Sequence, residues 1–318
     1  MKAFCISHVK DVDGIGAAAL VVAAKRALFL LTDYETLLRD LDRVPKGTTE
    51  FVLCDLGTDD SNRDAFVEKM AALASRCRVT YVDHHYLPEA TKRALARSGV
   101  TIVHDAEECA SMLCYKTFRD SLPKESLDIA LYGAVTDYMD SSPLAKRLME
   151  KTDRQFILAE ATLLSHAIGR MGDKEGFPEM VARELSRMKK PHEIDRVGEL
   201  ALLQLREATR ISEEVKRRGR RMGNLAYMRT TEYSTGNVAK LLIGAFDVPV
   251  AASFKEKQKG WCEVSLRGTS ECKVHLGKTI GRIALQLGGS GGGHKVAAGC
   301  HIPAARVQSM LRALSEKV

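Results

Sequence analysis

Short apolar runs alternate with alanine-rich or amphipathic stretches over the first third of the chain. We predict helices at residues 16–29 and 61–76, and strands at residues 3–7, 51–54, 79–82 and 100–103. Strands that alternate with helices favour a parallel, doubly wound α/β sheet, and strands that are apolar throughout fit a sheet covered on both faces. The first region is therefore predicted to be α/β with a mainly parallel sheet.

The apolar pattern changes twice farther along the chain. From residue 110 to residue 221 it is mostly helical, and residues 192–221 form a charged, proline-free stretch that indicates a helix linking two domains. After residue 223 short apolar runs return. We predict strands at residues 225–228, 250–254, 261–266 and 297–302, and helices at residues 279–287 and 304–316. Residues 250–254 and 261–266 are expected to form a hairpin.

The length of 318 residues is sufficient for two domains. We expect a first α/β domain at residues 1–185, a helical connector at residues 186–221, and a smaller α/β domain at residues 222–318.

Composition and cysteine usage indicate an ordinary cytoplasmic protein. The chain is 45% apolar and 28% charged. It contains no apolar run of the roughly 18 residues that a membrane span needs, so we expect no membrane partner. The first residues turn polar at once and lack a cleavage site, which does not fit a signal peptide. The 8 cysteines form no C-x-x-C pair, so we expect reduced core thiols rather than a zinc site.

The net charge of +7 comes from basic residues that concentrate after residue 180. Two interpretations stay open at this point. The charges could form a solvated helix face, or they could attract an anionic, phosphate-bearing substrate.

Aspartate and histidine side chains follow three of the predicted strands. They are His8, Asp11 and Asp13 after the first strand, Asp55 after the second, and Asp83, His84 and His85 after the third. Each alone could be a loop feature or a helix cap. However, the carboxyl ends of parallel strands meet at one edge of the sheet, where so many carboxylates would repel one another without cations. Mixed Asp and His ligation suits Mn²⁺ or Fe²⁺, and a set this large would hold two ions about 3.5–4 Å apart.

These motifs resemble those of a known family. His8-x-x-Asp11-x-Asp13-Gly14, Asp55-Leu56-Gly57, Asp83-His84-His85 and Gly133-Ala134-Val135-Thr136-Asp137 are similar, in order, to the four motifs of the DHH phosphoesterases. Residues 291–299 resemble the glycine-rich signature of the DHH-associated C-terminal domain. The chain is most similar to compact two-domain members: nanoRNases, phosphatases of adenosine 3′,5′-bisphosphate and stand-alone cyclic-dinucleotide phosphodiesterases.

The resemblance implies two metal ions, expected to be Mn²⁺ with Co²⁺ or Mg²⁺ as substitutes. His8 and Asp11 would hold one ion, Asp13, His84 and Asp137 the other, and Asp55 would bridge them. A water molecule activated by the pair would attack phosphorus. Asp83 would orient the histidines that follow it, and His85 would act beside the scissile phosphate as a hydrogen-bond donor or proton shuttle.

The resemblance also implies a substrate-binding set in the C-terminal domain. Its members are Arg267, Gly291, Gly292, Gly293 and His294, which would contact phosphate groups. Two features depart from the family pattern. The glycine run is longer than the usual form with four glycines, and two residues separate His8 from Asp11 where some nanoRNase-type members have three.

The implied function is hydrolysis of short oligonucleotides or linear dinucleotides to mononucleotides. Cleavage of a cyclic dinucleotide, or removal of the 3′-phosphate of adenosine 3′,5′-bisphosphate, would use the same metal site and stays open. Hydrolysis of pyrophosphate or polyphosphate is a more distant alternative. A non-catalytic nucleotide-binding regulator is expected to have lost metal ligands, and here none is missing. The sequence is compatible with a homodimer.

Overall fold

A computed structural model describes residues 2–58, 62–172, 174–258 and 260–318. The chain forms two compact units, Met1–Gln204 and Leu205–Val318. The division falls within helix α10 (Val197–Arg218), which lies in the expected connector. The boundaries expected at residues 185 and 221 lie on either side of this division and stay predictions.

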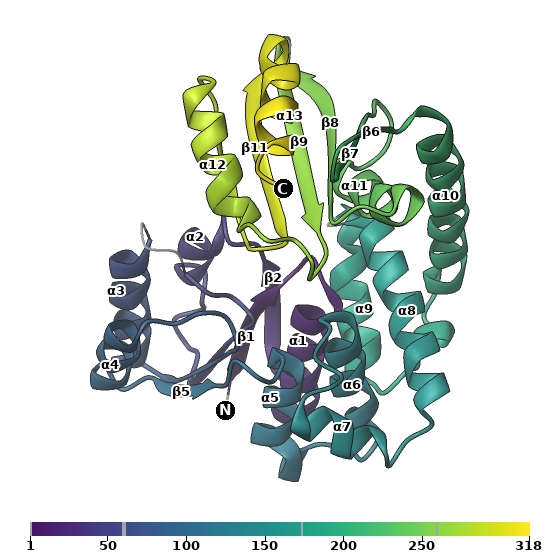
Figure 1. The fold of residues 1–318 in the computed structure, drawn as a ribbon. Coiled ribbons are helices and arrows are strands. Elements are labelled where there is room, and N and C mark those ends of the chain that lie inside the picture. Colours follow the sequence, from purple (N-terminus) through teal and green to yellow (C-terminus); the bar gives the residue numbers. More distant parts are fainter. Residues whose placement is uncertain (1, 59–61, 173, 259) are drawn as a thin grey trace. The chain divides into compact units, whose positions relative to one another are not determined.

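The first unit is built on a five-stranded sheet with the order β2-β1-β3-β4-β5, and all neighbouring pairs are parallel (Figure 1). The strands are β1 (Ala3–His8), β2 (Leu28–Thr32), β3 (Glu50–Cys54), β4 (Arg78–Asp83) and β5 (Thr101–His104). The predicted α/β fold with a parallel sheet is therefore confirmed.

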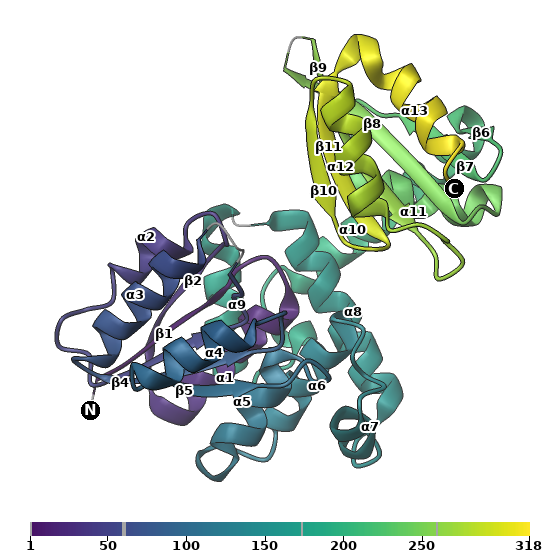
Figure 2. The same cartoon turned by 60° about the vertical axis from the view of Figure 1, so that its left-hand side comes forward.

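Helices cover both faces of this sheet (Figures 1 and 2). Cys5 of β1 points into a core with one helix group, and its neighbour Ile6 points into a second core with the other group. This two-sided burial explains why the strands are apolar along their whole length. The first group is α1 (Val12–Lys25), α5 (Ala110–Phe118), α6 (Ser126–Thr136), α7 (Pro143–Met149), α8 (Arg154–Met171) and α9 (Phe177–Ser186). The second group is α2 (Leu37–Leu41), α3 (Arg63–Ala74) and α4 (Glu89–Arg97).

The predicted helix at residues 16–29 is wrong at its C-terminal end, where the chain forms strand β2. Helix α1 ends at Lys25, and Arg26 adopts a left-handed backbone conformation with φ 51° whose N–H donates to the Val22 carbonyl. The chain then turns back, and Leu28 pairs in parallel with Phe4 of β1. Apolar residues at 28–31 extend the alanine-rich pattern, so periodicity alone could not separate a short buried strand from a longer helix.

The second unit contains a six-stranded sheet with the order β10-β11-β9-β8-β7-β6. The strands are β6 (Arg220–Met222), β7 (Leu225–Arg229), β8 (Val250–Gln258), β9 (Trp261–Gly268), β10 (Ser290–Gly293) and β11 (Ala297–Pro303). Strands β7 and β8 are parallel and the other neighbouring pairs are antiparallel, including the predicted β8–β9 hairpin. Helices α12 (Leu276–Gln286) and α13 (Val307–Ser315) pack on one face, and α11 (Thr235–Phe246) with the end of α10 packs on the other.

One further expectation needs correction, and one helix of this unit was not predicted. The connector helix was expected to run to residue 221, but α10 ends at Arg218, and Arg220 pairs with Tyr227 as the edge strand β6. Helix α11 was not predicted. Over the part of the chain that the structure describes, no helix has both the length and the apolarity needed to cross a membrane.

Candidate metal centre

The six predicted metal ligands lie together at the carboxyl edge of the parallel sheet. His8 ends β1, Asp55 follows β3, His84 follows β4, and Asp137 follows α6. Their ligand atoms form overlapping groups within 4.8 Å of one another: His8, Asp11 and Asp55; Asp13, His84 and Asp137; and Asp55, His84 and His85. We call His8, Asp11, Asp13, Asp55, His84 and Asp137 the ligand cluster. The individual ligand roles stay predictions.

Asp55 stands between the two halves of the ligand cluster. Its Oδ2 lies 3.6 Å from His8 Nδ1, and its Oδ1 lies 3.3 Å from His84 Nε2. On the first side His8 Nδ1 is 2.7 Å from Asp11 Oδ2. On the second side His84 Nε2 is 3.5 Å from Asp137 Oδ2. One carboxylate therefore faces both groups with different oxygens, which is the arrangement that a bridging ligand needs.

Backbone constraints hold Asp55 in this position. Its φ of 56° lies in the left-handed region, which is uncommon for a residue with a side chain and occurs often at functional sites. The Asp55 N–H donates to the Val82 carbonyl at 3.0 Å, so β4 fixes the strained turn. Gly14 allows α1 to approach, because a Cβ there would lie 2.5 Å from the His8 carbonyl oxygen and 2.9 Å from Asp55 Oδ2.

Asp13 is held by the first turn of helix α5. The backbone N–H groups of Ala110 and Ser111 each donate to a different Asp13 oxygen at 2.8 Å. The positive end of the helix dipole thus faces the carboxylate. Gly133 lets α6 pack closely, since a Cβ there would lie 2.0 Å from Ser111 Oγ and 2.6 Å from Asp13 Oδ1. Asp11 caps α1 by accepting from the Gly14 N–H at 2.9 Å, so it combines a structural role with its place in the cluster.

Asp83 and His85 form a pair beside the ligand cluster. His85 Nδ1 lies 2.8 Å from Asp83 Oδ1, and the Tyr81 hydroxyl donates to Asp83 Oδ2 at 2.6 Å. Asp83 is fully buried, so this network takes the place of solvent around its carboxylate. The predicted role of Asp83 in orienting the histidines fits its contact with His85. Among the described residues it has no hydrogen bond with His84.

Tyr34 is a site residue that the sequence pattern did not reveal. Its hydroxyl lies 3.0 Å from His85 Nε2, and its ring meets the His8 ring edge-on at 5.1 Å between centroids. Asp33 beside it pairs with Lys10 and lies 3.8 Å from His8 Nε2. Both residues follow β2, a strand that was not predicted and whose first two residues fell in the predicted helix at residues 16–29. Recognising residues 28–32 as a strand would have placed them at the same sheet edge.

Burial and mutual repulsion shift the pKa values of the carboxylates in the ligand cluster. Burial, with the charge of Asp13 next, raises the pKa of Asp55 to about 6 and that of Asp137 to about 7. Burial alone would lower the pKa of His8, but Asp11 and Asp55 outweigh it and raise it to about 10. In the same way Asp55 and Asp13 outweigh burial and raise the pKa of His84 to about 9.

These shifts are what a cation site shows before cations bind, because protons take the place of the missing positive charge. The donor set of aspartate oxygens and imidazole nitrogens suits divalent transition metals such as Mn²⁺. The residues therefore fit a pair of divalent cations.

The predicted substrate-binding residues lie close together within the second unit. Gly293 of β10 pairs with Ala298 of β11, and Arg267 of β9 pairs with Ala297 of β11. The exposed His294 donates its N–H to the Ala297 carbonyl at 2.7 Å. Arg267 and His294 thus lie on either side of Ala297, although 26 residues separate them in sequence.

The second part of the glycine run at residues 288–293 forms the edge strand β10, which begins at Ser290. Gly291, Gly292 and Gly293 pair with β11 in register, and Gly293 has a φ of 129°, which favours glycine. Helix α12 approaches this strand at Gly277, where a Cβ would lie 1.9 Å from the Gly293 carbonyl oxygen. The roles of Arg267, the three glycines and His294 in substrate binding stay predictions.

Two family models match the chain. The DHH family N-terminal domain matches residues 2–134, and the DHHA1 domain matches residues 224–318. The chain belongs to the DHH family of phosphoesterases. The ligand cluster except Asp137 lies in the DHH match, and Arg267, the glycine run and His294 lie in the DHHA1 match. None of the curated proteins is similar in sequence to this DHH family member.

Solved structures share the fold of this DHH protein at low sequence identity. The pGpG-specific phosphodiesterase PggH from Vibrio cholerae is 15% identical with a TM-score of 0.64, and the match covers 99% of this chain and 98% of that one. An exonuclease RecJ bound to manganese is 17% identical with a TM-score of 0.64, covering 99% and 89%. RecJ in complex with Mn²⁺ from Thermus thermophilus is 15% identical with a TM-score of 0.62, and the match covers 99% of this chain but 52% of that longer one.

Proposed function

We propose that this DHH family phosphoesterase is a metal-dependent phosphodiesterase that hydrolyses short oligonucleotides or linear dinucleotides to mononucleotides. The observation that carries the proposal is the position of Asp55, whose two carboxylate oxygens face His8 and His84 at 3.6 and 3.3 Å. A bridging carboxylate between two ligand groups is the arrangement used by two-metal phosphoester hydrolases.

His8 and Asp11 would hold one cation and Asp13, His84 and Asp137 the other, with Asp55 shared between them. Bound there, a pair of Mn²⁺ ions would polarise the phosphate and lower the pKa of a water molecule toward neutrality. The fixed backbone around Asp55 and Asp13 would keep the donors in place during turnover, so that little reorganisation is needed.

His85 is the residue of this chain best placed to handle a proton. Asp83 occupies its Nδ1, which leaves Nε2 facing Tyr34 at the open side of the site. Burial lowers the pKa of His85, but the Asp83 carboxylate outweighs it and raises the pKa above the ordinary value. A protonated His85 would donate to a phosphate oxygen or to the leaving oxygen. The Tyr34 hydroxyl would hold the ring in place.

Two exposed tyrosines support a nucleotide substrate. Tyr86 follows His85 and is 83% exposed, and Tyr138 follows Asp137 and is 82% exposed. Tyr138 also has a φ of 60°, a conformation that is strained for an aromatic residue. Aromatic rings beside a phosphate site provide stacking surfaces for bases. Neither ring contributes to a hydrophobic core of the described residues, so substrate binding would account for their exposure.

The named relatives point in the same direction. A pGpG-specific phosphodiesterase acts on a linear dinucleotide, and this chain covers 98% of that protein. RecJ is an exonuclease, and the match covers 89% of one RecJ chain. Both names concern phosphodiester bonds in nucleic-acid strands, which favours the oligonucleotide proposal over pyrophosphate.

The test is a substrate panel with the full chain and Mn²⁺. Linear pGpG, a five-nucleotide RNA, cyclic di-GMP, adenosine 3′,5′-bisphosphate and pyrophosphate would be supplied at equal concentration, and products would be separated by chromatography. We expect the highest kcat/KM for the linear dinucleotide or the short RNA, with mononucleotides as products. A preference for cyclic di-GMP, the bisphosphate or pyrophosphate would replace the proposal with that activity, and no turnover of any substrate would contradict it.

A further inference from the structure

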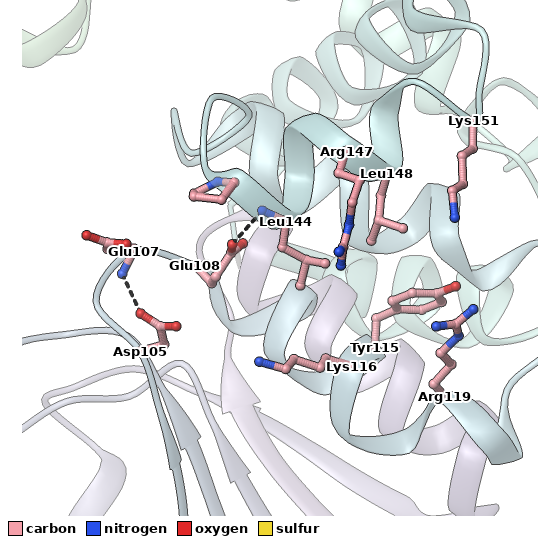
Figure 3. A pocket seen from close by; sticks show the side chains of 11 residues that line it. Asp105, Glu107, Glu108, Tyr115, Lys116, Arg119, Leu144, Arg147, Leu148 and Lys151 are labelled. Atoms are coloured by element: carbon pink, nitrogen blue, oxygen red, sulfur yellow. Dashed lines mark hydrogen bonds between the residues drawn. The ribbon is translucent and has the colours of Figure 1, made fainter.

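A cavity of about 760 Å³ lies in the first unit, beside helices α5 and α7 (Figure 3). It is lined from below by Tyr115, Lys116 and Arg119, and from above by side chains of α7 and by Lys151, which follows that helix. No member of the ligand cluster lines it. The cavity is therefore a separate feature that the proposed function does not use.

Four cationic side chains line this cavity, which we call the basic pocket: Lys116, Arg119, Arg147 and Lys151. Arg119, Arg147 and Lys151 point toward one end of the cavity, where the Tyr115 hydroxyl also lies (Figure 3). Across the described part of the chain, no ion pair or hydrogen bond engages any of the four side chains. Arg147 lies in the last turn of α7 and Lys151 in the turn that follows the helix, so two like charges point toward the same end of the cavity and repel each other.

Three carboxylates line the other end of the basic pocket: Asp105 and Glu108 have partners, whereas the exposed Glu107 side chain has no hydrogen bond or ion pair among the described residues. Glu108 accepts from the Ser142 hydroxyl at 2.8 Å and from the Leu144 N–H at 3.1 Å, so it holds the start of α7. Asp105 accepts from the Glu107 N–H at 3.0 Å. Among the described residues none of the three carboxylates pairs with the four cations, so an anionic ligand would offset the repulsion at the basic end.

The walls of the basic pocket indicate more than a bare ion. Leu144 and Leu148 face the cavity from α7, and the Tyr115 ring, which is 9% exposed, forms its floor (Figure 3). Apolar walls next to a cationic end suit a ligand with an apolar body and a phosphate group. We propose that the basic pocket binds a nucleotide, with its phosphate against Arg119, Arg147 and Lys151.

Helix α5 extends from the metal centre at its first turn to the basic pocket at its far end, so the two sites lie at opposite ends of one helix. Its first N–H groups hold Asp13, and its far end carries Tyr115 and Lys116. A rise of about 1.5 Å per residue puts Arg119 roughly 12 Å along the helix from Ser111. A nucleotide in the basic pocket would therefore occupy a second site, either as a free molecule or as the distant end of a bound strand.

The test compares two double variants of the full chain that lose the same charge. Arg147→Met with Lys151→Met removes two cations from the basic pocket. Lys124→Met with Lys146→Met removes two exposed cations that do not line it. Calorimetry with adenosine monophosphate and with inorganic phosphate, in buffer with a chelator, keeps the metal centre from contributing. We expect the pocket variant to bind adenosine monophosphate at least about tenfold more weakly, and the control to bind as the original chain does.

Measurements of KM distinguish whether the phosphate in the basic pocket belongs to a free nucleotide or to the distant end of a bound strand. A raised KM for a five-nucleotide RNA with an unchanged KM for a dinucleotide would assign the pocket to the distant end of a strand. Unchanged KM values with lost binding of adenosine monophosphate would assign it to a free nucleotide. Either result supports the site. Absent binding to the original chain, or equal weakening in both double variants, would overturn it.

A thermal melt excludes a merely structural role for the two cations. Since Arg147 and Lys151 make no bond to the described residues, the pocket variant should keep its Tm in phosphate-free buffer. A fall of several degrees relative to the control would contradict the proposal. Calorimetry with adenosine monophosphate needs no turnover, so its outcome does not depend on whether the proposed phosphodiesterase activity is found.

Discussion

Helix α5 holds Asp13 of the ligand cluster at its first turn and lines the basic pocket at its other end, and these two regions are built differently. In the ligand cluster short side chains are fixed by strand ends, by the turn at Asp55 and by N–H groups of α5. In the basic pocket long cationic side chains extend from helix surfaces without partners among the described residues. Rigid, buried donors suit chemistry at fixed atoms, whereas long exposed cations suit binding of an anion in more than one pose. We therefore expect substitutions to have abrupt effects in the first region and graded effects in the second.

Replacing Asp55 tests the rigid region most severely. Asp55→Asn keeps the size of the side chain but removes the charge that faces both His8 and His84. We expect kcat/KM for pGpG with Mn²⁺ to fall by about 10³-fold, or about 4 kcal/mol of transition-state stabilisation. Steady-state kinetics and a Mn²⁺ titration would check this. An active variant that still binds its full complement of Mn²⁺ would refute the bridging position.

Competition between protons and cations gives a pH dependence with a defined sign. The pKa of His8 is raised to about 10 and that of His84 to about 9, so both imidazoles carry a proton at about pH 7.5 before cations bind. Ligation requires neutral imidazoles, so Mn²⁺ binding should release about two protons and strengthen by up to about 10²-fold per pH unit between about pH 7 and 8.5. Calorimetry in two buffers with different ionisation enthalpies measures the protons released. Affinity that is constant across this range would count against ligation by both histidines.

The close contact of α6 with α5 provides a stability test. A Cβ at Gly133 would lie 2.0 Å from Ser111 Oγ and 2.6 Å from Asp13 Oδ1. We expect Gly133→Ala to lower the free energy of unfolding by about 1–3 kcal/mol through overpacking, and to weaken Mn²⁺ binding. At Gly169 in α8 a Cβ would meet no atom within 4 Å, so Gly169→Ala should instead add up to about 1 kcal/mol. Denaturation curves of the two variants would separate these outcomes.

Tyr138 shares one feature with each region. It is exposed like the cations of the basic pocket, and it directly follows Asp137 of the ligand cluster. We expect Tyr138→Ala to raise KM for pGpG about tenfold through lost base stacking, while kcat changes little. Bis(p-nitrophenyl) phosphate has no base, so its kinetics should be unchanged and provide the control. Equal losses on both substrates would mean that Tyr138 supports the metal centre rather than the base.

The sequence pattern predicted the parallel sheet and the positions of the ligand cluster because both follow from short-range signals. Apolar strands end directly in His8, Asp55 and Asp83, and parallel strands bring such ends to one edge. Tyr34 was missed because β2 extends an alanine-rich helix pattern, and only its pairing with β1 makes it a strand. Tertiary contacts of this kind override local propensity.

The basic pocket was beyond sequence reasoning for a different reason. Arg119 and Arg147 are 28 residues apart, and neither belongs to the basic runs after residue 180. Only the packing of α7 beside α5, fixed by Glu108 and Ser142, brings them to one cavity. Of the basic residues that concentrate after residue 180, Arg220 and Arg221 lie in the short edge strand β6.

We propose that Asp55 joins two cation sites at the carboxyl edge of the sheet. The most direct measurement is anomalous diffraction at the manganese edge from crystals grown with Mn²⁺. We predict two anomalous peaks per chain about 3.5–4 Å apart, one beside His8 and Asp11, the other beside Asp13, His84 and Asp137, with Asp55 reaching both. A single peak, or two peaks of which Asp55 contacts only one, would contradict the account.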